Sequence, residues 1–495
     1  MIKQLFKVKS LDSILKESES QQHKLKRVLG AFDVVMLGIG AIIGAGIFAT
    51  IGTAAAGDAF RPGAGPALIL SFVLTAIACG FAALCYAEFA ALVPISGSAY
   101  TYSYATLGEF VAWIIGWDLI IEYAVGNVAV AISWANYFKT FVAGFGVIIP
   151  DWLSTDYRTA GKIPGLFENA PHIFGIPIVF NILAFGIVAL ITIVLVIGIK
   201  SSSRTNAAMV LLKLIVLAFF VFVGLHYVKP ENWKPFAPNG WAGVQAGAAV
   251  VFFAYIGFDA VSTVAEEVKN PKRDLPIGII GSLVICTIIY IVVAAVFTGI
   301  IPYTALVQML STQQAEPLTM ALQYANIDKW GDLFVGIVAF GSVIAHTAVL
   351  LVFQLGQPRI FFSMARDGLL PQGFAKVHPK YRTPYVTTIF TGLAVGVVSM
   401  FTSIDEMVDL TNIGTLFAFV LVCLGILILR KREPNRPRSF KTPFVPLIPI
   451  LGIISCLYLM LGLPWITWIR FGLWLIAGMA IYFLYGYRKS KLRNG

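Results

Sequence analysis

Two glycine-containing apolar segments have the composition to bind a small charged solute with backbone atoms. Residues Gly38–Phe48 read GIGAIIGAGIF, and residues Phe252–Val261 read FFAYIGFDAV. Each glycine weakens a helix by about 1 kcal/mol relative to alanine, so both segments are candidates for unwound helix. A broken helix exposes N–H groups at its new N-terminus and carbonyl oxygens at its new C-terminus, which suit a carboxylate and an ammonium group respectively. The two segments together could hold a zwitterionic amino acid.

Close helix packing is the alternative explanation for the glycines of the first segment. Gly40 and Gly44 have the GxxxG spacing that lets two membrane helices approach each other. The tight pair Gly44 and Gly46 around Ala45 favours an unwound turn instead.

Lys213 is the one Lys or Arg that falls well inside an apolar run. It lies seven residues past the expected start of its helix, roughly 10 Å into the bilayer at the rise of an α-helix. A snorkelling lysine is the alternative, but the reach to the interface would be strained. We expect Lys213 to be functional, because a lysine amine that exists both charged and neutral can carry a proton.

Other ionisable residues also lie deep in apolar segments, where each needs a reason to be there. Asp118 and Glu122 are one helical turn apart on one face, and the alternative to a functional role is a structural hydrogen-bonding network. Asp259 is expected to cap the second half of its broken helix. His346 is alone in its segment, and a satisfied core histidine is the alternative to a residue of the substrate pocket.

These residues need a membrane-embedded frame, which the composition supplies. The chain is 58% hydrophobic and 12% charged, against about 25% charged in soluble domains. Apolar stretches long enough to cross ~30 Å of hydrocarbon predict about twelve transmembrane helices. Their expected ranges are 32–55, 66–92, 105–142, 176–199, 206–228, 241–265, 277–300, 331–358, 384–402, 408–429, 445–464 and 468–487.

The distribution of basic residues predicts the orientation of these helices. With the N-terminus inside, 27 of the 36 Lys and Arg residues fall in cytoplasmic segments and eight fall outside. This asymmetry follows the positive-inside rule and explains the net charge of +11 without nucleic acid. The polar segment 1–31 lacks the features of a cleaved signal peptide, so the first apolar helix is expected to be a span.

Nothing in the loops predicts catalysis. The longest loops, 143–175 and 301–330, carry no nucleophile–base, nucleotide or zinc pattern, so an enzyme or an ATP-driven pump is not expected. All five cysteines lie in apolar runs, and neither disulfides nor a metal site nor any cofactor is expected.

Several segments resemble the amino acid–polyamine–organocation (APC) superfamily, and within it the cationic amino acid transporter family. Besides the run Gly38–Phe48, these are Glu267–Gly278 (EVKNPKRDLPIG), Pro358–Pro371 (PRIFFSMARDGLLP) and Met407–Leu416 (MVDLTNIGTL). They follow the family's order over the first ten helices. The chain has twelve expected helices, like bacterial members, whereas vertebrate members are larger.

The resemblance implies an all-α, LeuT-like five-plus-five inverted repeat with broken helices 1 and 6. The expected organisation is a cytoplasmic N-terminal tail at 1–31, a transport core at 32–429, helices 11 and 12 at 445–487 and a cytoplasmic C-terminal tail at 488–495. It also implies alternating access and coupling to protons. In the family a helix 5 lysine, matched by Lys213, lies against unwound helix 1, and Glu122 matches an acid of helix 3 near the site.

We therefore expect a plasma-membrane transporter that moves an L-amino acid, small neutral or cationic, with a proton. The expected carboxylate donors are the N–H groups of Ile43, Gly44, Ala45 and Gly46. The expected ammonium acceptors are the carbonyls of Phe253, Ala254 and Ile256, with Phe253 as a gate. Lys213 and Glu122 would carry the coupling, and His346 would border the substrate side chain.

Alternatives remain. The first alternative is an amino acid exchanger of the same fold that is not coupled to an ion. A transporter-like nutrient sensor is a less favoured alternative, because it would need a longer signalling tail. A channel is disfavoured by the lack of a pore motif. A small accessory subunit or a bound lipid stays open, and no nucleic acid partner is expected.

Overall fold

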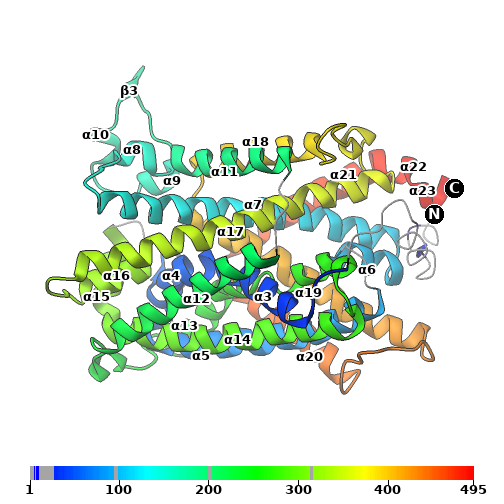
Figure 1. Cartoon of the computed structure of the whole chain (residues 1–495), viewed down its shortest axis with the longest axis horizontal. Coiled ribbons are helices and arrows are strands. Elements are labelled where there is room, and N and C mark those ends of the chain that lie inside the picture. The colour runs from blue at the N-terminus through cyan, green and yellow to red at the C-terminus, as the bar shows by residue number, and fades with distance from the viewer. Residues whose placement is uncertain are drawn as a thin grey trace.

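The computed structural model describes residues 5, 7–9, 27–93, 98–198, 203–312 and 316–494. Most of the expected N-terminal tail therefore lies outside the described residues. The described part is a bundle of helices that run roughly parallel to its long axis (Figure 1). We call the end that carries the C-terminal residues the tail end, and the opposite end, with strands β3 and β4, the hairpin end. Lys7 lies at the tail end, where its Nζ donates to the carbonyl of Leu492 over 2.7 Å.

Nine helical segments of the described chain are long and apolar enough to cross a membrane, which fits a multi-pass membrane protein. Three shorter apolar helices coincide with the remaining expected spans. The nine are Ala31–Ala56, Gly65–Leu92, Glu109–Ala143, Asn206–Leu225, Gly240–Ser262, Pro271–Ile300, Gly331–Arg366, Ile404–Arg432 and Trp465–Lys489, and the shorter three are Ile182–Ile197, Tyr385–Phe401 and Leu447–Leu461.

Ten helices form most of this framework as single elements. They are α5 (Leu68–Leu92), α7 (Glu109–Ala143), α11 (Ile182–Ile197), α12 (Ser203–Leu225), α14 (Pro271–Ile300), α17 (Gly331–Arg366), α18 (Tyr385–Phe401), α19 (Ile404–Arg432), α20 (Leu447–Leu461) and α21 (Trp465–Ile481). The first and sixth spans are each divided, into α3 (Ala31–Ile42), η1 (Gly46–Thr50) and α4 (Ile51–Ala56), and into α13 (Gly240–Val251), η4 (Phe252–Tyr255) and η5 (Asp259–Glu267).

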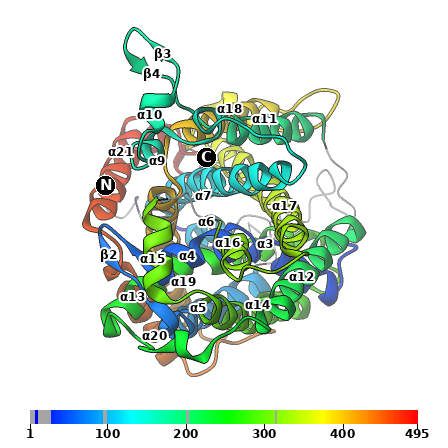
Figure 2. The same ribbon diagram turned by 90° about the vertical axis from the view of Figure 1, so that its left-hand side faces the viewer.

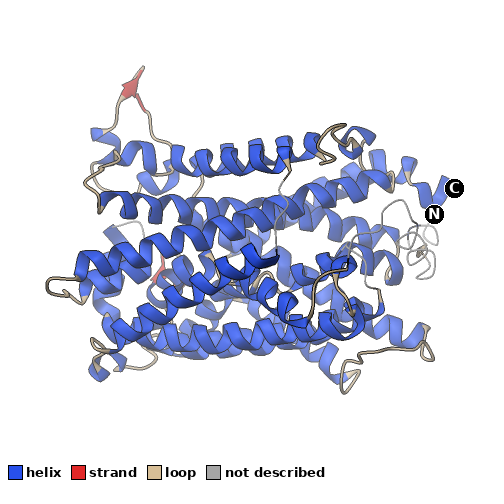
Figure 3. Cartoon of the chain, in the orientation of Figure 1, coloured by secondary structure: helices blue, strands red, loops and turns tan. Residues whose placement is uncertain are grey.

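Short elements complete the loops. The helical ones are η2 (Gly65–Ala67), α6 (Ser98–Thr106), α8 (Asp151–Ser154), α9 (Tyr157–Ala160), α10 (Leu166–Asn169), η3 (Pro230–Trp233), α15 (Tyr303–Thr312), α16 (Pro317–Tyr324), η6 (Gln372–Ala375), η7 (Tyr482–Gly486), α22 (Tyr487–Lys489) and α23 (Lys491–Asn494). The strands pair as two small antiparallel hairpins, β1 (Gly57–Asp58) with β2 (Arg61–Pro62) and β3 (His172–Ile173) with β4 (Ile176–Pro177) (Figure 3).

The third span begins later than the sequence predicts. Residues 105–106 belong to the separate helix α6, and α7 starts at Glu109. Gly108 lies between the two helices with φ +97°, a conformation that residues with a Cβ rarely adopt, so the helices cannot be continuous there. At 35 residues α7 is about 52 Å long, which exceeds the ~30 Å hydrocarbon core, so it must tilt or project.

The two divided spans lie at the centre of the bundle. In their most apolar stretches 83% of the first span and 94% of the sixth span is buried, against 22% for the last. Viewed from the hairpin end, α4 lies inside a ring of helices, with α11, α18 and α21 at the rim (Figure 2). The interrupted helices are therefore the ones most shielded from lipid, where irregular backbone is tolerated.

Candidate functional site

The first span is interrupted where the glycine run predicts it. Helix α3 ends at Ile42, and Ile43 adopts an extended conformation with φ −75° and ψ 106°. Helical structure resumes with the π-helical turn η1 at Gly46. The break therefore places the carbonyl end of α3 and the N–H end of the resumed helix side by side at the middle of the span.

The sixth span is interrupted at Ile256 and Gly257. Ile256 is extended, with ψ 134°, and Gly257 has φ +122°, which strongly favours glycine. A Cβ on Gly257 would lie 2.8 Å from the carbonyl carbon of Ala41, so the missing side chain also lets the sixth span approach the first. The Gly257 N–H donates to Asp259 Oδ1 over 3.2 Å, so this carboxyl group contacts the break itself, whereas the expected cap would need a bond to an N–H further along η5.

The two breaks touch each other. A Cβ on Gly46 would lie 2.2 Å from the Cα of Ala254, so only glycine permits this crossing. A Cβ on Gly44 would lie 2.7 Å from Cγ2 of Val349 on α17. Close helix packing, the alternative explanation for the glycines, thus applies at both positions alongside the break.

Lys213 on α12 is bonded to the first break. Its side chain is fully buried, and its Nζ donates to the carbonyl of Gly40 over 2.7 Å and to that of Ile43 over 3.0 Å. The side chain therefore does not extend to an interface as a snorkelling lysine would. It places a cationic group at the C-terminal end of α3, where the helix dipole favours positive charge.

Two tyrosines that the sequence analysis did not single out also contact the breaks. The hydroxyl of Tyr290 on α14 lies 3.1 Å from the Ile42 carbonyl and 2.9 Å from the Ala254 carbonyl, so it bridges the two spans. Tyr137 on α7 donates to the Phe48 carbonyl over 2.6 Å. The available signal was a hydroxyl group within an apolar stretch, but Tyr290 shares its helix with Thr287 and Thr298, so the signal was weak.

The other backbone positions expected to bind substrate gather at the same crossing. Phe253, Ala254 and Ile256 are buried in and beside η4. The Ala254 carbonyl already has Tyr290 as a donor, and a carbonyl oxygen with two lone pairs can accept one further bond.

His346 on α17 lies beside the resumed part of the first span. Its ring centroid is 5.7 Å from that of Phe48 and 5.6 Å from that of Tyr137. Both ring nitrogens have partners: Nδ1 lies 2.5 Å from the Ser342 carbonyl and Nε2 lies 2.7 Å from Ser133 Oγ. Because a carbonyl only accepts, Nδ1 carries the proton in this arrangement.

Glu122 and Asp118 form a buried acidic pair on α7. Within the described chain neither Asp118 oxygen nor Oε2 of Glu122 has a hydrogen-bond partner. A Cβ on Gly414 of α19 would lie 2.7 Å from Asp118 Oδ1, so glycine makes room for this carboxyl group. Within the described residues no ion pair joins either carboxyl group to Lys213, whose Nζ is bonded to the first span.

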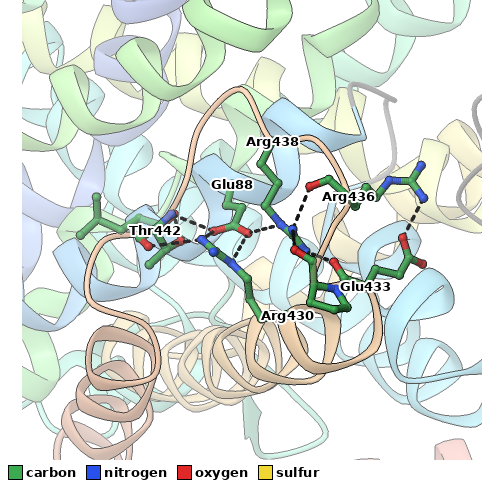
Figure 4. A network of polar contacts seen from close by, with 8 residues as sticks. Glu88, Arg430, Glu433, Arg436, Arg438 and Thr442 are labelled. Atoms are coloured by element: carbon green, nitrogen blue, oxygen red, sulfur yellow. Dashed lines mark hydrogen bonds and ion pairs between the residues drawn. The ribbon is translucent and has the colours of Figure 1, made fainter.

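Acidic residues near the span ends are buried in ion pairs. At the hairpin end, Arg61 lies 2.6 Å from Asp409 and 2.8 Å from Asp58, so the β1–β2 hairpin is attached to α19. At the tail end, Glu88 on α5 is fully buried and accepts from Arg430 (Figure 4). Local sequence patterns could not identify these partners, because each pair joins segments far apart in the chain.

Comparison with known proteins places the whole chain in one family. The model of the family described as "Amino acid permease" matches residues 29–485. The branched-chain amino acid permease BcaP of Bacillus subtilis is 48% identical, and the methylthioribose transporter of the same organism is 44% identical, each over 99% of both chains. The vacuolar cationic amino acid transporter 4 of Arabidopsis thaliana is 35% identical over 87% of this chain and 68% of its own length. The chain is therefore a multi-pass membrane protein that belongs to the amino acid permease family of the APC superfamily, a family of transporters rather than enzymes.

Proposed function

We propose that this protein is a secondary active transporter that takes up an L-amino acid together with a proton. The observation that carries the proposal is the direct contact of two interrupted helices, marked by Gly46 against Ala254. Two helix breaks that meet inside a bundle bring backbone N–H groups and carbonyl oxygens to one place. A zwitterionic solute can bind there, with its anionic group at the N–H groups and its cationic group at the carbonyls.

The proposed substrate clamp uses the backbone on both sides of the crossing. The N–H groups of Gly44, Ala45 and Gly46 bind the carboxylate, because the helix that resumes at η1 directs its first N–H groups and its positive dipole end at the break. The expectation for Ile43 is wrong, because its N–H already donates to the Ile39 carbonyl over 2.9 Å as the last bond of α3. The carbonyls of Phe253, Ala254 and Ile256 accept from the ammonium group. Phe253 closes over the bound substrate as a gate.

Proton coupling is assigned to Lys213, with Glu122 as a second titrating group. Lys213 contacts the carbonyls of Gly40 and Ile43 on the two sides of the α3 terminus. A change of its charge alters its attraction for these carbonyls and so the position of the first break. The nearest rival, an uncoupled exchanger, would not need a titrating group there, and a nutrient sensor is the more remote alternative.

The proposed architecture is a LeuT-like five-plus-five inverted repeat. Its core is 32–429, with helices 11 and 12 at 445–487 outside it. The first and sixth spans, both interrupted, are five spans apart and therefore run in opposite directions, as corresponding helices of an inverted repeat do. The excess of Lys and Arg on the tail-end segments supports an orientation with the tails 1–31 and 488–495 in the cytoplasm, and the plasma membrane is the proposed location.

For the substrate class we propose a neutral amino acid. One similar protein is named as a branched-chain amino acid permease. In addition, both ring nitrogens of His346 already have hydrogen-bond partners, and an imidazole carries no negative charge that could pair with a cationic side chain. Methylthioribose, named for another similar protein, has neither carboxylate nor ammonium and would leave the proposed clamp unpaired.

A substrate screen in proteoliposomes tests this proposal. Uptake of each of the twenty labelled amino acids is measured with an inward proton gradient, with protein-free liposomes as control and unlabelled methylthioribose as competitor. We expect uptake of alanine or a branched-chain amino acid that methylthioribose does not inhibit. Uptake of none of the twenty amino acids, or amino acid uptake that methylthioribose inhibits, would refute the proposed substrate class.

A further inference from the structure

A groove of ≈ 600 Å³ lies on the outside of the bundle at the tail end. One wall is the beginning of α14, with Lys272, Arg273, Ile277 and Ile280, and the other is the loop after α19, with Ser439 and Phe440. Neither the proposed substrate clamp nor the proposed proton coupling uses these residues.

The wall of the groove formed by α14 changes from basic to apolar along the helix. Lys272 and Arg273 are exposed in the first helical turn, whereas Ile277 and Ile280 follow one and two turns later. At 1.5 Å per residue, Ile280 lies about 12 Å deeper than Lys272 along the helix axis. Asp274, the acid of the first turn, is only 4% exposed and so faces the interior. The groove therefore offers positive charge at its outer end and apolar surface toward the middle of the bilayer.

A buried ion-pair network holds the second wall in place (Figure 4). Arg430 donates from Nε and Nη2 to the two carboxylate oxygens of Glu88, each over 2.8 Å. The Thr442 N–H donates to Glu88 Oε2 over 2.8 Å, and Arg438 Nε lies 3.0 Å from Glu88 Oε1. Arg438 and Thr442 flank Ser439 and Phe440, so this wall is attached to α5 on both sides of the groove residues.

We propose that this groove binds an anionic phospholipid of the cytoplasmic leaflet. The phosphate lies between Lys272 and Arg273, and the Ser439 hydroxyl, which also lines the groove, is the one further polar side chain there. An acyl chain runs along Ile277, Ile280 and Phe440. Charge complementarity selects an anionic headgroup, and the apolar depth selects a lipid over a soluble phosphate. The proposal requires only that the tail end faces the cytoplasm, and it is independent of what the protein transports.

Lipid titration of the purified full-length protein tests this site. Thermal unfolding in a neutral detergent is followed while phosphatidylglycerol, phosphatidylcholine or soluble glycerol 3-phosphate is added. We expect phosphatidylglycerol to raise the unfolding temperature at concentrations about tenfold or more below those at which phosphatidylcholine acts, since two basic groups near the headgroup contribute to binding. Glycerol 3-phosphate alone is expected to have no effect. Equal stabilisation by the two lipids, or by glycerol 3-phosphate, would overturn the proposal.

Matched variants locate the effect. The double variant Lys272→Gln/Arg273→Gln removes the charges of the groove, and Lys269→Gln removes an exposed charge from the same loop outside it. We expect the double variant to lose the preference for phosphatidylglycerol while Lys269→Gln keeps it. Ile280→Ser should weaken stabilisation by both lipids. An undiminished preference in the double variant, or an equal loss in Lys269→Gln, would show that general surface charge rather than this groove attracts the lipid.

Discussion

The Nζ of Lys213 lies 2.7 Å from the carbonyl oxygen of Gly40, so a side chain of the fifth span is bonded to the backbone of the first just before its break. A second bond to the Ile43 carbonyl, over 3.0 Å, spans the end of α3. The charge on one amine thereby acts on two carbonyls at the C-terminal end of α3, next to the proposed carboxylate site. This relationship makes Lys213 the centre of the proposed coupling mechanism.

Gly257 should be sensitive to a single added methyl group. Gly257→Ala forces a residue with a Cβ into φ +122° and brings that Cβ to 2.8 Å from the Ala41 backbone, so we expect a loss of roughly 2–4 kcal/mol of stability and weaker substrate binding. Gly80→Ala on α5 is the control, because a Cβ there meets nothing within 4 Å. Thermal unfolding and equilibrium binding measure both effects. A Gly257→Ala protein as stable as Gly80→Ala would contradict the close crossing.

His346 should influence which side chains the pocket accepts. His346→Ser removes the ring beside Phe48 and Tyr137, so we expect a larger pocket in which unlabelled arginine competes better against labelled alanine than it does in the wild type. His226→Ser, at an exposed position after α12, serves as the control. If arginine competes equally well against alanine in the wild type and in His346→Ser, His346 is a core residue whose role is limited to its hydrogen bonds with Ser342 and Ser133.

Glu316, in the loop before α16 at the hairpin end, should make stability depend on pH. Burial raises the pKa of its carboxyl group to about 7, although hydrogen bonds from Thr140 and Thr319 oppose the shift. Because the folded state then binds this proton more tightly than the unfolded state, the group stabilises the fold below about pH 4.5. That contribution is lost as the pH rises from about 4.5 to about 7.

The variant Glu316→Gln should flatten this part of the pH profile, by about 1–2 kcal/mol once partial exposure is allowed for. Unfolding temperatures from pH 4.5 to pH 8 provide the measurement. Glu168→Gln, at an exposed position of the same end, should leave the profile unchanged. A profile in Glu316→Gln identical to that of the wild type would rule out Glu316 as its source.

The sequence predicted the frame of this protein better than its side-chain partners. Apolar length located the helices, and glycine content located the two breaks, because both are properties of a single segment. The separation of α6 from α7 at Gly108 was missed, since hydropathy does not register a positive φ. The contact of Tyr290 with Ile42 and Ala254, and that of Glu88 with the loop after α19, join segments far apart in the chain, so local patterns could not predict them.

Uptake driven by a proton gradient in the Lys213→Ala protein tests the central claim most directly. Labelled substrate is followed into proteoliposomes with an inward proton gradient, with and without a protonophore, and Lys229→Ala, an exposed lysine after the same helix, is the matched control. We predict that wild type and Lys229→Ala accumulate substrate until the protonophore is added, whereas Lys213→Ala, folded as judged by gel filtration, shows no gradient-driven uptake. Acid-stimulated uptake by Lys213→Ala equal to that of the wild type would remove Lys213 from the mechanism and contradict the account.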